Sequence, residues 1–140
     1  MWSAPYRNIS LFAILFAGIN LARMKLLIAD DHPGVRKLIR ELVAHLADEI
    51  CECADGAEAV RLSGEFLPDC LIMDLNMPVM DGFEATRRVM IALPGARVIA
   101  ISHSKHPEAE LRARRVGAIC FISKEDLSVL PRYLSGINNL

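Results

Sequence analysis

Short apolar runs alternate with amphipathic stretches five times from Lys25 onward, and this alternation constrains the fold more than any other feature. The first run is apolar throughout, as expected of a strand covered on both faces of its sheet. Alternating strands and helices with short connections predict right-handed crossovers and a parallel sheet between two helical layers. The predicted strands are Leu26–Ala29, Ile50–Ala54, Cys70–Met73, Arg97–Ile101 and Ile119–Ile122.

Apolar residues at helical spacing mark the segments between these runs. We expect helices at about 35–46, 57–66, 82–93, 108–116 and 130–137. Pro94-Gly95 ends the third helix, Gly117 follows the fourth as its C′ residue, and Pro131 fits the first turn of the fifth. The predicted fold class is therefore α/β, with a doubly wound five-stranded parallel sheet in the order 2-1-3-4-5. This arrangement is a flavodoxin-like three-layer sandwich.

Polar side chains with reactive groups fall at the ends of the predicted strands. Asp30 and Asp31 follow the first strand, Asp74 the third, Ser102 the fourth and Lys124 the fifth. The carboxyl ends of parallel strands share one crevice, where ligands bind. Carboxylates about 4 Å apart repel by several kcal/mol at an effective dielectric near 20, so such a cluster needs a cation. Oxygen ligands of this kind suit Mg²⁺ bound together with phosphate.

The side chains around this crevice suit phosphoryl chemistry. A carboxylate can act as a nucleophile and form an aspartyl phosphate, and Asp74, at the end of the central strand, is the best candidate. Ser102 can donate a hydrogen bond to a phosphoryl oxygen. Lys124 supplies a compact positive charge that can pair with a carboxylate or with the incoming group.

Residues 25–140 resemble the receiver domain of bacterial two-component response regulators. Each matching piece is short, but their order and spacing together are specific. The matching pieces are Leu26-Leu27-Ile28-Ala29-Asp30-Asp31, Asp74-Leu75-Asn76-Met77-Pro78-Val79-Met80-Asp81-Gly82, Val98-Ile99-Ala100-Ile101-Ser102, Gly117-Ala118 and Phe121-Ile122-Ser123-Lys124.

The resemblance implies a role for each matching position. Asp74 would accept a phosphoryl group from a histidine kinase or a phosphotransfer protein. Ser102 and Lys124 would contact that group, and Phe121 matches the aromatic switch position that changes rotamer as Ser102 moves. Mg²⁺ would be held by Asp30, Asp31, Asp74 and the backbone carbonyl of Asn76. The partner-binding face of the family is formed by the fourth helix, the fifth strand and the fifth helix.

Two positions depart from the family pattern. His103 stands where a small residue usually follows the switch hydroxyl, and its imidazole could restrict access to the crevice or change the lifetime of the phosphoryl group. Glu125 stands where proline commonly follows the lysine. The opening Asp30-Asp31-His32-Pro33 and the missing proline resemble receivers joined to helix-turn-helix output domains, but we interpret this chain as a stand-alone receiver.

Three other functions remain open at this stage. A phosphorelay intermediate would use the same chemistry but pass the phosphoryl group to a phosphotransfer domain. A pseudo-receiver would only bind proteins, without phosphorylation. A small phosphatase on the same fold usually has a second acid two residues after the nucleophile, where this chain has Asn76. We expect no enzyme activity beyond the protein's own phosphorylation and dephosphorylation.

Composition limits the partners and the location. The net charge is −1, so there is no basic excess to drive direct nucleic acid binding. The four cysteines lack the spacing of a zinc site, and reduced thiols suit the cytoplasm. We expect a kinase or phosphotransfer partner, an unknown downstream protein target, and a monomer or a phosphorylation-dependent dimer.

The first 23 residues differ from the rest of the chain. Residues 9–22 are apolar apart from Ser10 and Asn20, a run too short for an ordinary membrane span of roughly 20 residues. We interpret residues 1–23 as a non-native N-terminal extension and residues 24–140 as the receiver domain, with Met24 as the true start. A membrane anchor and a signal peptide are the alternatives. Membrane association is expected only if the run is native and inserted.

Overall fold

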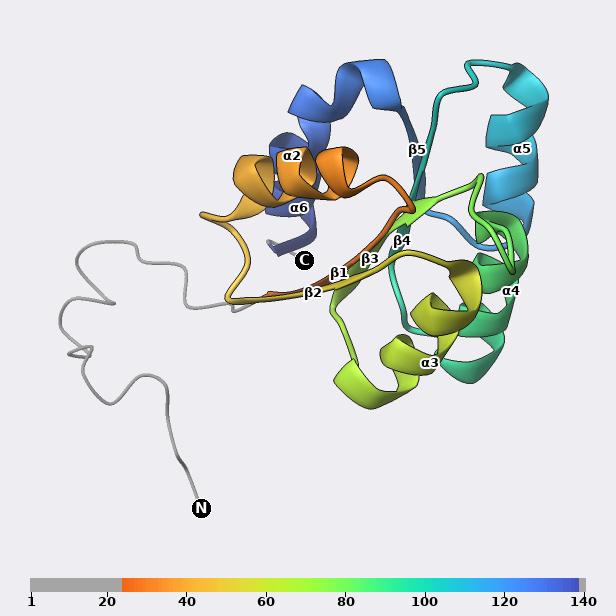
Figure 1. Cartoon of the computed structure of the whole chain (residues 1–140), viewed down its shortest axis with the longest axis horizontal. Coiled ribbons are helices and arrows are strands. Elements are labelled where there is room, and N and C mark those ends of the chain that lie inside the picture. Colours follow the sequence, from red (N-terminus) through yellow and green to blue (C-terminus); the bar gives the residue numbers. More distant parts are fainter. Residues whose placement is uncertain (1–23, 139–140) are drawn as a thin grey trace, which may run out of the picture.

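The computed structural model describes residues 24–138, and the predicted extension of residues 1–23 lies outside them. Within this range the chain forms one parallel sheet in the order β2-β1-β3-β4-β5, which confirms the predicted topology (Figure 1). The strands are β1 (Lys25–Ala29), β2 (Glu49–Cys53), β3 (Cys70–Asp74), β4 (Val98–Ser102) and β5 (Cys120–Ser123). The helices are α2 (Pro33–Val43), α3 (Gly56–Phe66), α4 (Gly82–Ala92), α5 (Pro107–Arg115), the 3₁₀ helix η1 (Lys124–Val129) and α6 (Leu130–Asn138).

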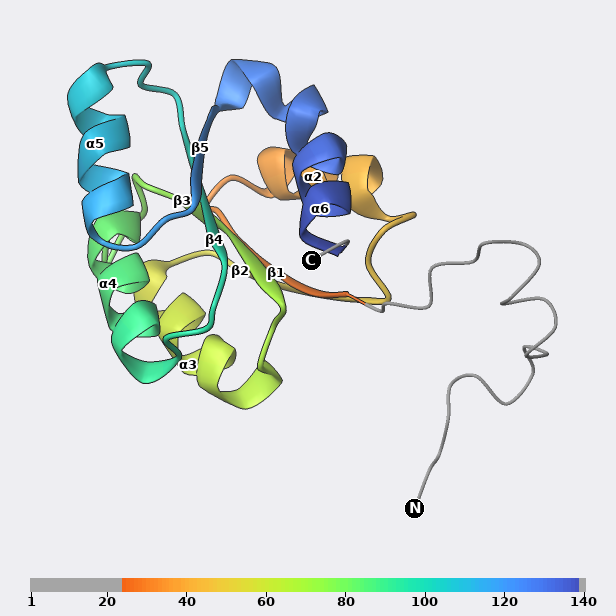
Figure 2. The same ribbon diagram turned by 180° about the vertical axis from the view of Figure 1, so that it is seen from behind.

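Helices cover both faces of the sheet. Figures 1 and 2 show α2 and α6 on one face, and α3, α4 and α5 on the other. Successive strand side chains point to opposite faces, so β1 contributes to two cores. Leu26 and Ile28 pack in the cluster that includes residues of α2 and α6, while Leu27 and Ala29 pack with residues of α3 and α4. This two-sided burial explains why the strand runs are continuously apolar.

Several element boundaries differ from those predicted. Asp74 and Ser102 are the last residues of their strands rather than the residues that follow. The first helix ends at Val43, three residues before the last apolar residue of its pattern, although Leu46 still packs against the core. Gly117 has φ of 116° and follows Val116, the C-cap of α5, as predicted for the C′ position.

The 3₁₀ helix η1 was not predicted. Its first residue is Lys124, and the Ser123 hydroxyl accepts a hydrogen bond from the Glu125 backbone N–H at 3.3 Å. A proline after Lys124 would have no N–H for this bond. A residue other than proline at position 125 therefore allows this cap at the start of η1. Pro131 lies in the first turn of α6, as expected.

No helix within residues 24–138 has both the length and the apolar character needed to cross a membrane. All four cysteines are free, and Cys70 and Cys53 are buried. Burial raises the pKa of both thiols to about 12, so they behave as small apolar groups of the core.

Candidate functional site

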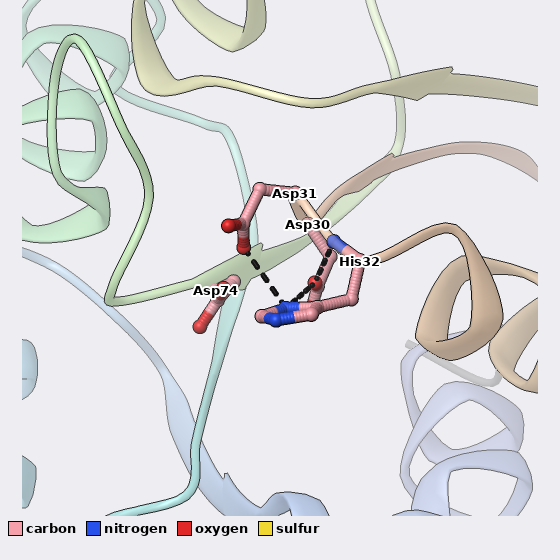
Figure 3. Close-up of side chains that lie close together, drawn as sticks. All are labelled: Asp30, Asp31, His32 and Asp74. Atoms are coloured by element: carbon pink, nitrogen blue, oxygen red, sulfur yellow. Dashed lines mark hydrogen bonds and ion pairs between the residues drawn. The ribbon is translucent and has the colours of Figure 1, made fainter.

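Three carboxylates, which we call the acidic cluster, meet at the carboxyl edge of the sheet: Asp30, Asp31 and Asp74. Ala29 of β1 pairs with Met73 of β3, so Asp30 and Asp74 come at the same level on neighbouring strands. The three side chains lie close together there (Figure 3). Asp30 and Asp74 are buried, with relative exposures of 0% and 1%, whereas the Asp31 side chain is 31% exposed. The structure thus brings together the three acids that the sequence predicted to meet.

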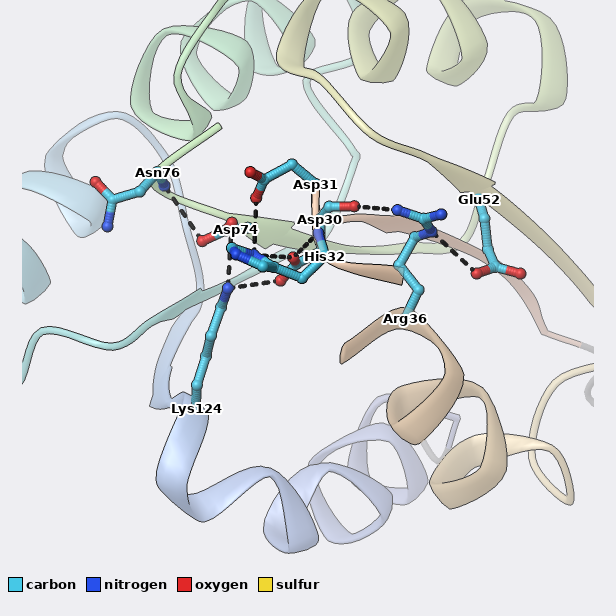
Figure 4. Close-up of polar contacts among 8 residues, drawn as sticks. All are labelled: Asp30, Asp31, His32, Arg36, Glu52, Asp74, Asn76 and Lys124. Carbon is cyan, nitrogen blue, oxygen red and sulfur yellow. Dashed lines mark hydrogen bonds and ion pairs between the residues drawn. The ribbon is translucent and has the colours of Figure 1, made fainter. Parts of the chain in front are cut away.

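Lys124 joins this cluster from the other side of the crevice. Its Nζ lies 2.7 Å from Asp30 Oδ2 and 3.2 Å from Asp74 Oδ2, and the side chain is only 2% exposed (Figure 4). A buried ammonium is costly unless it is paired, and here two carboxylates pair with it. One lysine against three carboxylates still leaves an excess of negative charge.

The electrostatics of the cluster act most strongly on Asp74. Burial, and next the charge of Asp30, raise the pKa of Asp74 from 3.8 to about 6. The Asn76 backbone N–H, which donates to Asp74 Oδ1 at 3.2 Å, and the Lys124 ammonium oppose this rise in pKa. The carboxyl group is therefore mainly ionised near neutral pH, as a nucleophile or a metal ligand must be.

The donor set fits a divalent cation. One potential ligand atom from each of Asp30, Asp31, His32 and Asp74 lies within 4.8 Å of the others. Two buried oxygens, Asp30 Oδ2 and Asp74 Oδ2, share the single Lys124 ammonium, and Asp31 Oδ1 lies 3.1 Å from His32 Nδ1. One ammonium does not offset three carboxylates, so a bound cation would stabilise the cluster. Three carboxylates and one ammonium carry a net charge of −2, which a divalent ion neutralises.

Two contacts that hold the site were missed from the sequence. Arg36 in α2 donates from Nη1 to the Asp30 carbonyl at 2.6 Å, and its Nε lies 3.3 Å from Glu52 Oε1 in β2 (Figure 4). These contacts fix the end of β1, from which Asp30 and Asp31 project. His32, to which the sequence pattern assigns no role, also lies with the three acids.

The start of α4 packs so closely against the backbone of Asp74 that only glycine fits at position 82. A Cβ on Gly82 would lie 2.0 Å from the Asp74 carbonyl oxygen, far below any real contact distance. Gly82 instead donates from its N–H to the Leu75 carbonyl at 3.1 Å. Asp81 caps α4 by accepting from the Glu84 N–H at 2.9 Å, so the Asp81-Gly82 pair turns the chain from the crevice into the helix.

Ser102 and Phe121 occupy neighbouring strands. Ser102 pairs with Ser123, next to Lys124, and its hydroxyl accepts from the Ser104 N–H at 3.0 Å. Phe121 is half-buried and packs against a small cluster that includes Leu75 and Ala100. A hollow of about 320 Å³ lies beside Ser102, lined in part by Leu75, Asn76, Phe83 and Arg112.

The two departures from the family pattern both lie at the surface. His103 is exposed directly after Ser102. Glu125 is 65% exposed, and its Oε2 lies 2.5 Å from the Nζ of Lys105. This ion pair connects the loop after β4 with the start of η1, so the two chain segments that carry Ser102 and Lys124 are in contact outside the crevice.

The chain belongs to the response regulator receiver domain family. The model of this family, described as "Response regulator receiver domain", matches residues 26–134. It is 36% identical over 104 residues to the uncharacterized transcriptional regulatory protein YhcZ of Bacillus subtilis, a match that covers 73% of this chain and 49% of that protein. It is also 36% identical over 106 residues to protein-glutamate methylesterase/protein-glutamine glutaminase 4 of Myxococcus xanthus, covering 72% of this chain and 30% of that protein. The chain therefore spans half or less of the length of these relatives.

Solved structures share the same fold. A two-component response regulator of the LuxR family from Aurantimonas sp. SI85-9A1 matches with a TM-score of 0.78 and 31% identity, covering 84% of this chain and 86% of that one. The response regulator domain of Thermotoga maritima CheB matches with a TM-score of 0.73 at 24% identity, covering 84% and 98%, and this likeness supports the fold alone.

Proposed function

We propose that this protein is a phosphoacceptor response regulator that receives a phosphoryl group on Asp74 from a histidine kinase or a phosphotransfer protein. The observation that carries the proposal is the placement of Asp74. Its carboxylate is buried at the end of β3, close to Asp30 and to the Lys124 ammonium that contacts both carboxylates. An ionisable carboxylate at a crevice, beside a fixed cation and further acids, suits nucleophilic attack on phosphorus.

The transfer needs few groups. An Asp74 carboxylate oxygen attacks the phosphorus of the donor phosphohistidine, an oxygen–phosphorus bond forms, and the nitrogen–phosphorus bond breaks with its electron pair returning to the donor imidazole. Lys124 and Ser102 would hold phosphoryl oxygens. Mg²⁺, when bound, neutralises charge on the phosphoryl oxygens. Asp30, Asp31, Asp74 and the backbone carbonyl of Asn76 would hold this ion.

Phosphorylation would then switch a protein-binding surface. The phosphoryl group adds a charge of roughly −1.5 to −2, which draws Ser102 and Lys124 toward Asp74. Phe121 would change rotamer as Ser102 moves, and the face formed by α5, β5 and α6 would change its affinity for a protein partner or a second copy. Leu111 on α5, Ile119 before β5 and Tyr133 on α6 are each about half exposed, which suits protein contact.

A cytoplasmic location follows from this proposal, because the phosphoryl donor of a two-component system is cytoplasmic. The phosphorelay and pseudo-receiver alternatives differ from it in their outcomes. A relay intermediate would return its phosphoryl group to a phosphotransfer domain, and a pseudo-receiver would show neither labelling nor Mg²⁺ affinity.

Labelling with a small phosphodonor tests the proposal. The full chain is incubated with phosphoramidate, with and without Mg²⁺, and phosphoprotein is separated on a phosphate-affinity gel. We expect Mg²⁺-dependent labelling of the wild type and of Asp81→Asn, whose carboxylate only caps an exposed helix start, and no labelling of Asp74→Asn. Equal labelling of Asp74→Asn would refute the assignment.

A further inference from the structure

We infer that His32 is a fourth metal-binding side chain of this site, and that its imidazole shifts the metal preference from Mg²⁺ toward Mn²⁺ and later first-row divalent ions. The inference rests on the proposed function, since it concerns the metal of the same phosphoacceptor site. It assigns to His32 a role in metal selectivity that neither the motif nor the family match supplies.

The His32 side chain does not serve as a helix cap, and its only polar contacts in the described part of the chain are with the acidic cluster. His32 is the N-cap residue of α2, but its side chain makes no capping hydrogen bond to the helix. Its backbone N–H donates to Asp30 Oδ1 at 2.8 Å, which fixes the residue beside the acidic cluster. The ring is 60% exposed, so core packing does not account for its orientation, and Figure 3 shows it turned toward the carboxylates.

The distances suit a shared ion. Nδ1 of His32 lies 3.1 Å from Asp31 Oδ1 and 3.3 Å from Asp30 Oδ1. Ligand atoms on adjacent octahedral positions are separated by about 3 Å when the metal–ligand bonds are about 2.1 Å long. The imidazole nitrogen therefore lies at the spacing of a neighbouring ligand from each of the two carboxylate oxygens.

A second observation, the charge of the cluster, is independent of the histidine. Asp30 and Asp74 are fully buried, and the Oδ2 atom of each faces the same Lys124 ammonium. The Lys124 ammonium lies near both, but it offsets only one of the three negative charges. One potential ligand atom from each of the three acids and His32 lies within 4.8 Å of the others, so a cation that offsets the remaining charge would lie within reach of the His32 ring.

The chemical nature of the ligand sets the preference. Mg²⁺ is a hard ion that binds oxygen and gives up its waters reluctantly, whereas imidazole suits transition metals. Affinity for a nitrogen-containing site rises from Mn²⁺ along the first row toward Cu²⁺. An imidazole at this position therefore favours Mn²⁺ over Mg²⁺ compared with the same site built from oxygen alone.

Calorimetric titration of the metal-free full chain with MgCl₂ and MnCl₂ tests the inference. In His32→Gln we expect the affinity for Mn²⁺ to fall about tenfold, a loss typical of removing one contributor to a metal site, while the Mg²⁺ affinity changes by less than about threefold. His45→Gln serves as the matched control, because His45 is an exposed histidine beyond the far end of α2. Its two affinities should match those of the wild type.

Pulsed electron paramagnetic resonance of bound Mn²⁺ gives a readout that a structural role would not change. Imidazole nitrogen modulation should be present in the wild type and His45→Gln and absent in His32→Gln. If His32 is only a protonated counter-ion of the carboxylates, its replacement should change the Mg²⁺ and Mn²⁺ affinities by the same factor, which would overturn the inference. A wild type that binds neither ion would overturn the metal site of the proposed function as well.

Discussion

Replacing Asp74 with asparagine should stabilise the metal-free protein at neutral pH. Burial and the charge of Asp30 raise the Asp74 pKa from 3.8 to about 6, so ionisation of this group is less favourable in the folded chain than in the unfolded chain. A shift of about two pKa units corresponds to about 3 kcal/mol of unfolding free energy at pH 7.5. Asparagine removes this cost, because it has a similar shape and no charge. The expected gain of Asp74→Asn is therefore about 3 kcal/mol as an upper value.

The sign of the pH dependence follows from the raised pKa. The folded state holds the proton more tightly, so the contribution of Asp74 to stability is fully present below about pH 4 and is lost as the pH rises through about 6. The advantage of Asp74→Asn should accordingly shrink to about 0.5 kcal/mol near pH 4.

Urea unfolding in the presence of a chelator, followed by circular dichroism from pH 4 to 7.5, measures this difference. Glu41→Gln on the exposed face of α2 controls for loss of a carboxylate, and its effect should be small at every pH. The reasoning fails if Asp74→Asn is no more stable than the wild type at pH 7.5, or if the gain does not shrink in acid.

Two further predictions follow from the site geometry. Gly82→Ala should destabilise the fold by several kcal/mol, because its Cβ would lie 2.0 Å from the Asp74 carbonyl oxygen, whereas Gly64→Ala, with open space around its Cβ, should stabilise α3 by about 0.5–1 kcal/mol. Thermal unfolding measures both effects, and an unchanged stability of Gly82→Ala would contradict the packing of this loop. Lys124→Met should raise the pKa of Asp74 further, because the Lys124 ammonium lowers this pKa in the wild type. Nuclear magnetic resonance titration of the Asp74 carboxyl carbon measures the pKa, and an unchanged or lower value in the variant would disprove the pairing.

The sheet order and the meeting of the acidic cluster could be predicted because they depend on local pattern and topology. Continuous apolar runs identify buried parallel strands, and parallel strands bring their carboxyl ends to one edge. Once the order was known, Asp30 and Asp74 had to lie on neighbouring strands. The family match supports this interpretation, while the roles of Ser102, Phe121 and the Asn76 carbonyl stay predictions.

Other features depend on distances that a sequence pattern does not contain. The contacts of Arg36 with Glu52 and with the Asp30 carbonyl require the rotation of α2 against β2, which periodicity alone leaves open. The 3₁₀ helix after β5 begins with a cap by Ser123, which the apolar pattern does not reveal. The proximity of His32 to the carboxylates depends on a side-chain orientation. The sequence places His32 directly after two aspartates, but a polar residue at a helix start is common and does not by itself indicate a ligand.

Trapping the phosphoryl group at its residue tests the central claim most directly. The protein is labelled with phosphoramidate and Mg²⁺, reduced with borohydride, which converts an aspartyl phosphate to homoserine, and digested for peptide mass spectrometry. The account predicts homoserine at position 74 and at no other aspartate. Homoserine at Asp30, Asp31 or Asp81 instead, or phosphate retained on a serine or histidine, would contradict it.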